Sequence, residues 1–106
     1  MSRVKLKDPT NHGEVTHLIN EYAYSDELDL HITVHADERM EERGVNEDFL
    51  MKTLREGTVI EHEIETYPNG NSSIKYRVSH RDNLGEETVA ITVIPGEYQL
   101  TIVTIW

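Results

Sequence analysis

The sequence contains no cysteine, which excludes disulfide bonds and thiolate chemistry. It also lacks any apolar run close to the roughly 18 residues of a membrane-spanning helix, and its first residues lack the apolar core of a signal peptide. No phosphate-binding glycine loop and no Gly-x-Ser-x-Gly elbow is present. These absences predict a cytoplasmic protein that has no membrane partner.

Basic residues are scarce. The chain has 10 lysines and arginines against 20 aspartates and glutamates, so its formal net charge is −10 over 106 residues. Nonspecific nucleic-acid binders normally carry a basic face, and this balance argues against that class. It fits a soluble protein, a protein with a basic partner, or a mimic of nucleic acid. The length predicts one domain with a single core.

The first part of the chain predicts one helix. Within residues 14–24 the apolar side chains recur at i, i+3, i+4 and i+7, as Val15, Leu18, Ile19 and Tyr22. We interpret residues 1–27 as an N-terminal extension that contains this helix, which packs on the main domain or docks a partner. Residues 28–106 form the main domain. Its first segment, residues 28–34, alternates apolar and polar side chains and predicts a short strand or an extended lead-in.

The most informative stretch is residues 35–44, which predicts a helix that ends at a glycine. On this helix His35, Arg39 and Arg43 stand at i, i+4 and i+8, so they form one cationic stripe. One interpretation is a functional site. The other is an ordinary helix surface, on which Arg39 pairs with Glu42 and His35 is simply the residue at the helix start.

A second helix is predicted from the cap residue Asn46 to the glycine that follows residue 56. The period then changes to two, which predicts four strands, over residues 58–66, 73–80, 88–94 and 98–106. The last is apolar at nearly every position, so we expect it to be central and buried on both faces. The predicted fold class is α+β, with two or three helices packed on one face of a four-stranded antiparallel meander sheet.

The helical phrase His-Ala-x-x-Arg-Met-x-x-Arg-Gly is followed by a second helix, a Gly-x-Val-Ile step at residues 57–60 and the strand meander. This order resembles a bacterial and archaeal family of unknown function that is grouped with the RelE/ParE-like toxin superfamily. The resemblance covers roughly residues 31–106. It implies a RelE-like fold and a toxin-type activity, with RNA or the ribosome as target and an antitoxin as partner. The superfamily also contains gyrase poisons and members without known activity.

The leading functional prediction is a metal-independent endoribonuclease that works by attack of the RNA 2′-hydroxyl. Such an enzyme needs a general base, a general acid and cations that stabilise the phosphorane. Histidine suits proton transfer near neutral pH, and arginine binds phosphate through two parallel hydrogen bonds. The resemblance points to three candidate catalytic residues: His35, Arg39 and Arg43. The candidate substrate-binding residues share the second strand of the meander: Lys75, Arg77 and His80. For Lys75 and Arg77 the other interpretation is a solvated strand face.

The alternative is an acidic inhibitor that imitates nucleic acid and binds a basic nucleic-acid-binding protein. Three glutamates line one face of the first strand of the meander: Glu61, Glu63 and Glu65. Their spacing of about 6.8 Å is close to the phosphate spacing of a single nucleic-acid strand. A solvated sheet edge explains the same row without any partner.

No cofactor and no metal are predicted. His31 and His35 have the spacing of a zinc pair only if both lie on one helix, and His31 falls in a strand-like segment. The remaining histidines show no spacing typical of metal ligands.

Overall fold

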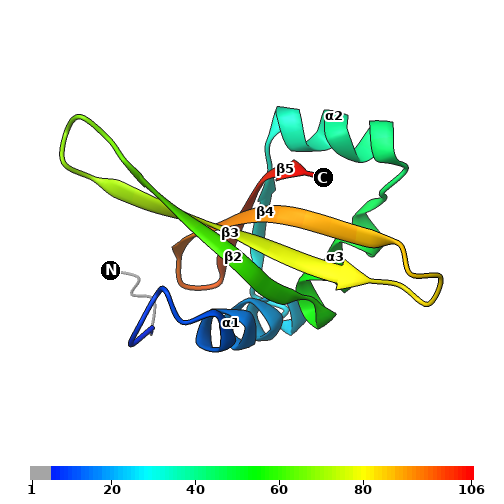
Figure 1. The fold of residues 1–106 in the computed structure, drawn as a ribbon, viewed down its shortest axis with the longest axis horizontal. Helices are drawn as coiled ribbons and strands as arrows, with labels where there is room; N and C mark the ends of the chain where they lie inside the picture. The colour runs from blue at the N-terminus through cyan, green and yellow to red at the C-terminus, as the bar shows by residue number, and fades with distance from the viewer. Residues whose placement is uncertain (1–5) are drawn as a thin grey trace.

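The computed structural model describes residues 6–106. In this part of the chain the elements are α1 (His12–Tyr24), β1 (Asp29–Ile32), α2 (Val34–Arg43), α3 (Glu47–Glu56), β2 (Thr58–Thr66), β3 (Ser72–Arg81), β4 (Glu87–Gly96) and β5 (Gln99–Ile105) (Figure 1). No helix in residues 6–106 has both the length and the apolar character needed to cross a membrane.

The helices begin and end where local chemistry favours it. Each begins after a residue whose side-chain oxygen accepts a backbone N–H from three positions further on: Asn11, Thr33 and Asn46. Helix α2 ends at Gly44, whose φ of 67° lies in the left-handed region that glycine adopts readily. The predicted helix and its glycine stop are therefore confirmed.

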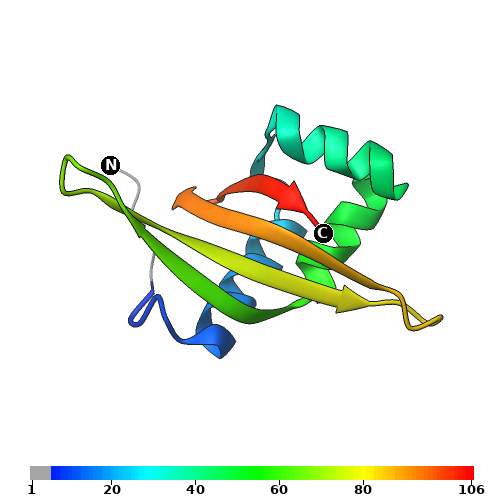
Figure 2. The ribbon, with the colours of Figure 1, turned by 45° about the horizontal axis from the view of Figure 1, so that its top comes forward.

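The strands form one five-stranded sheet in the order β1-β5-β4-β3-β2 (Figure 2). Strands β2 to β5 are the predicted antiparallel meander, but β1 adds a fifth strand that runs parallel to β5, with Asp29 beside Gln99 and Ile32 beside Ile102. The prediction of a four-stranded, wholly antiparallel sheet is therefore wrong. Parallel neighbours are joined by long crossovers, so no short turn motif in the sequence predicts that they pair.

The three helices pack against different strands of the sheet. Helix α1 contacts β2, α3 contacts β3 and β4, and α2 contacts β5 (Figure 1). All three contribute to one core, in which the fully buried side chains include Ile19, Leu50, Leu54, Leu100, Ile102 and Ile105. Helix α1 is thus part of the same core as the rest of the domain.

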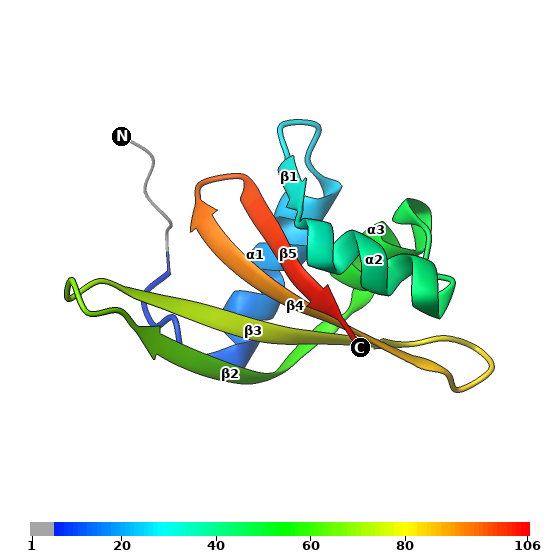
Figure 3. The ribbon, with the colours of Figure 1, turned by 90° about the horizontal axis from the view of Figure 1, so that it is seen from above.

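The outer face of β3, β4 and β5 has no helix across it (Figure 3). For this reason β5 is not buried on both faces as predicted: Leu100, Ile102 and Ile105 are buried, while the residues between them are half-buried. Strand β5 is nevertheless internal, since it lies between β1 and β4. We call this uncovered surface the open face.

Candidate functional site

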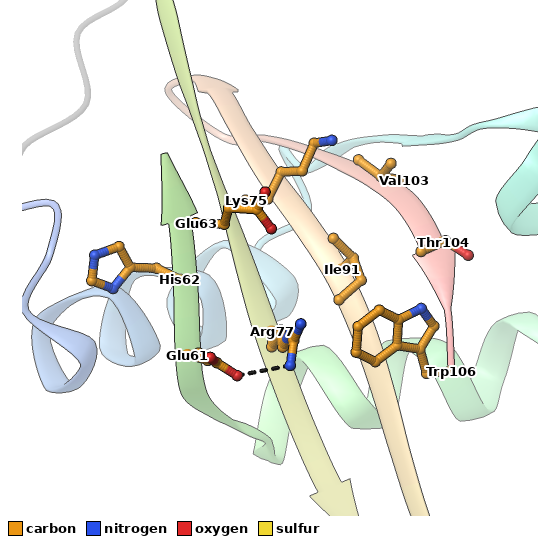
Figure 4. Close-up of a pocket in the computed structure, with 9 residues that line it drawn as sticks. All are labelled: Glu61, His62, Glu63, Lys75, Arg77, Ile91, Val103, Thr104 and Trp106. Atoms are coloured by element: carbon orange, nitrogen blue, oxygen red, sulfur yellow. Dashed lines mark hydrogen bonds and ion pairs between the residues drawn. The ribbon is translucent and has the colours of Figure 1, made fainter. Parts of the chain in front are cut away.

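The open face contains a hollow of about 290 Å³ that crosses four strands (Figure 4). Its apolar lining comes from Ile91 on β4, Val103 on β5 and the ring of Trp106, which directly follows β5. Its charged lining comes from β2 and β3. A concave surface that combines apolar side chains with charged groups can hold a ligand that has both apolar and charged parts.

Lys75 and Arg77 both line this hollow, as the strand alternation predicts. Each is paired with a glutamate of β2. The Arg77 Nη1 atom lies 2.7 Å from Glu61 Oε2, and the Lys75 Nζ atom lies 2.8 Å from Glu65 Oε2. The cations and the glutamate row, which the sequence presents as separate features, therefore form one network on the open face.

The Lys75–Glu65 pair makes a testable pH prediction. Hydrogen bonding to Lys75 and its positive charge lower the pKa of Glu65, and the hydrogen bond to Glu65 raises the pKa of Lys75. The pair therefore stabilises the folded chain at neutral pH. This contribution is lost as pH falls through the folded-state pKa of Glu65, below the usual glutamate range, or rises through the raised pKa of Lys75. In Lys75→Met we expect the Glu65 pKa to return to its ordinary value.

Carboxyl-carbon NMR titration measures this change directly. Arg77→Met is the matched control, since it removes a neighbouring cation that pairs with Glu61 and not with Glu65. Equal Glu65 pKa values in the wild type and in Lys75→Met would show that the ion pair does not form in solution.

Trp106 lies at the centre of the site. The Arg77 guanidinium carbon is 4.3 Å from the centroid of its ring, within cation–π distance, and the residue is 43% exposed. Trp106 also lines a second hollow, of about 320 Å³, together with Arg43 and Glu87. It thus separates the hollow of the open face from the end of α2. In the sequence it is only the last residue of the strand predicted over residues 98–106.

The cationic stripe of α2 faces the end of β5. The Thr33 hydroxyl, at the start of α2, donates to the Val103 carbonyl at 2.9 Å, and Arg39 Nε donates to the Ile105 carbonyl at 3.3 Å. Arg43 then lines the second hollow beside Trp106. His35 is exposed one turn before Arg39 on the same stripe. Helix α2 therefore follows the second half of β5 and brings the stripe to the border of the open face.

One contact of α2 fits the plainer interpretation of the stripe as well. Arg39 Nη1 pairs with Glu42 Oε2 at 3.0 Å, as expected for an ordinary helix surface. Because its Nε atom also bonds the carbonyl of Ile105, Arg39 is held against the end of β5. Of the three stripe residues, His35 and Arg43 are more exposed than Arg39.

His80 does not lie on the same face of the sheet as Lys75 and Arg77. It shares the alternation of Tyr76 and Val78, which are buried in the core on the covered face of the sheet. Its Nδ1 atom is buried without a hydrogen-bond partner among the residues that the structure describes. The three predicted substrate-binding residues thus lie on two faces of the sheet.

Two further polar features were not predicted from the sequence. The Thr104 side chain lines the hollow of the open face, and its buried Oγ1 atom has no hydrogen-bond partner within residues 6–106. On the covered side, His12 Nε2 of α1 and His62 Nδ1 of β2 lie 2.8 Å apart and join helix to strand. Within the described residues, no group of three or more histidine, aspartate or glutamate side chains is arranged to hold a metal ion.

The fold and the site define a small α+β domain whose uncovered sheet face carries paired charges around a tryptophan. Residues 32–106 match the sequence pattern of a family described as a domain of unknown function, DUF4258. The chain belongs to this family. Neither a curated protein nor a solved structure matches the chain. Helix α1 and most of β1 precede the matched region.

Proposed function

We propose that this chain is a toxin-type domain of the RelE-like kind that acts on RNA, as a metal-independent endoribonuclease. The observation that supports this most is the convergence of two cationic groups on Trp106. Arg77 stacks on its ring from β3, and Arg43 lines the hollow on its other side from α2. These residues are far apart in sequence and meet only in the fold.

The grouping suits a single RNA strand. Tryptophan stacks well on a nucleobase, and a base stacked on a protein aromatic ring is worth about 1–3 kcal/mol of binding free energy. The guanidinium groups of Arg43 and Arg77 can hold phosphates on either side of such a base through paired hydrogen bonds. His35, exposed on the same stripe of α2, is the candidate for proton transfer to or from the reacting hydroxyl.

The structure weakens the case for the acidic mimic. Two of its three glutamates are paired with cations of β3, so the row presents fewer free carboxylates than its spacing alone predicts. The same pairs oppose the binding of RNA, because a phosphate must compete with Glu61 for Arg77. The net charge of −10 adds a general repulsion that salt screens. We therefore expect activity on RNA to depend strongly on the displacement of these ion pairs.

The test is RNA cleavage by the purified protein in the presence of a chelator, with and without ribosomes. We expect wild type to cleave and both His35→Ala and a double variant, Arg77→Ala with Trp106→Ala, to lose cleavage. Lys52→Ala is the matched control, since Lys52 is exposed on α3 and its loss removes one positive charge away from the site. It is expected to cleave as wild type does.

Circular dichroism of each variant separates loss of the site from loss of the fold. The proposal is overturned if folded wild type leaves RNA intact both alone and with ribosomes. It is also overturned if all three variants cleave as well as the wild type, because a contaminating nuclease would then account for the activity.

A further inference from the structure

Strand β2 is an edge of the sheet, and the far half of its hairpin with β3 projects beyond the helices (Figures 1 and 2). One side of β2 pairs with β3 from Thr58 to Thr66. At the start of its other side, the Val59 N–H donates to Thr16 Oγ1 of α1 at 2.8 Å. From Ile60 to Thr66, no backbone group on that side has a partner within the described part of the chain.

The two faces of this free edge differ in chemistry. On the open face stand Glu61, Glu63 and Glu65. Glu63 is exposed and has no ion pair among residues 6–106, while its two neighbours in the row are paired with β3. On the covered side Ile64 lies opposite Ile74 of β3 and remains 54% exposed. A strand added along β2 would therefore meet carboxylates on one face and an aliphatic side chain on the other.

This pattern disfavours pairing between two copies of the chain. If two β2 edges met antiparallel about His62, Glu61 of each copy would stand opposite Glu63 of the other. Like charges directly opposite one another destabilise a strand pair. Pairing of a second copy with the free edge of β2 is therefore unfavourable. A strand that carries cations at alternate positions would pair favourably with it.

We infer that β2 is a docking edge for an extended segment of a partner protein in which lysine or arginine alternates with apolar residues. The segment adds a sixth strand beyond β2 through backbone hydrogen bonds. Its cations meet the carboxylates of the open face, and its apolar side chains pack beside Ile64. This inference does not depend on activity toward RNA, because the edge and its charges exist whether or not the open face binds a nucleic acid.

The experiment uses the full chain, isotopically labelled, and a synthetic peptide of about nine residues that alternates lysine and valine, the length of β2. We expect binding, with the largest backbone amide shifts in β2. A peptide with the same side chains but with every backbone amide N-methylated has no N–H group left to donate to β2, and it is expected not to bind. A peptide with glutamate in place of lysine is also expected not to bind.

Two protein variants test the role of charge. Glu63→Lys is expected to weaken binding of the lysine–valine peptide about fivefold, as for loss of a good surface ion pair. Asp26→Lys changes an exposed charge in the turn after α1, and it is expected to leave the affinity unchanged. Both positions are exposed, so both variants should fold.

Three results would overturn the inference. The first is no binding of the unmodified peptide to the folded protein. The second is equal binding of the N-methylated peptide, which would show charge attraction without strand addition. The third is a set of amide shifts centred on β1 or α2 and not on β2.

Discussion

Replacing Leu54 by alanine is expected to lower the free energy of unfolding by about 3 kcal/mol. The Leu54 side chain is fully buried in the core, where α3 packs against α1, β3 and β4. Alanine would remove most of this side chain and leave a cavity that the surrounding helices and strands cannot close completely. The loss combines the transfer free energy of the side chain with the cost of the cavity.

Urea unfolding followed by circular dichroism measures this loss. Leu84→Ala is the matched control, because Leu84 is 87% exposed in the loop between β3 and β4 and should change stability by less than about 0.5 kcal/mol. Similar unfolding midpoints for the two variants would mean that α3 is not packed into the core as described.

Replacing Gly57 by alanine is expected to lower the free energy of unfolding by about 2–3 kcal/mol. Here the cause is overpacking and not a cavity. A Cβ atom at Gly57 would overlap the Thr53 carbonyl oxygen and would lie 2.9 Å from the Ser79 carbonyl oxygen. Both are backbone atoms, so neither can rotate away. The missing side chain allows the chain to leave α3 and enter β2 directly against β3.

Gly13→Ala is the control, and it is expected to raise the stability and not to lower it. Gly13 lies in the first turn of α1, and its nearest neighbour for a new Cβ is Asn11 Oδ1 at an ordinary 3.5 Å. Alanine favours the helix over glycine, so stability should rise by roughly 0.5–1 kcal/mol. If Gly57→Ala were as stable as wild type in urea, the close approach between α3 and β3 would have to be looser than the structure places it.

Local signals in the sequence predict most of the secondary structure. The caps at Asn46 and Gly44 mark helix boundaries through hydrogen bonds within a few residues, and the period of two marks β2 to β5. Those interactions are short in sequence, so a window of a few residues contains them. The same alternation also predicts that Lys75 and Arg77 share a face, which the hollow confirms.

The arrangement around the site depends on distant pairings that no window contains. Trp106 is held by two backbone hydrogen bonds to Val89 of β4, and its ring contacts Arg77 of β3. Likewise, the pairing of Glu65 with Lys75 requires the register of the β2–β3 hairpin, in which Ile64 lies opposite Ile74. Sequence alternation gives the face of each strand but not the neighbour across it.

The parallel pairing of β1 with β5 affects how the protein can be made. The Thr33 hydroxyl donates to the carbonyl of Val103, 70 positions later in the chain. Asp29 of β1 lies beside Gln99 of β5, which is equally far along the chain. During synthesis, β1 therefore has no strand to pair with until β5 has left the ribosome. Such long-range pairing slows folding, because a large loop must close before the contacts form. We expect the sheet to grow from the β2–β5 meander, with β1 and the start of α2 joining last.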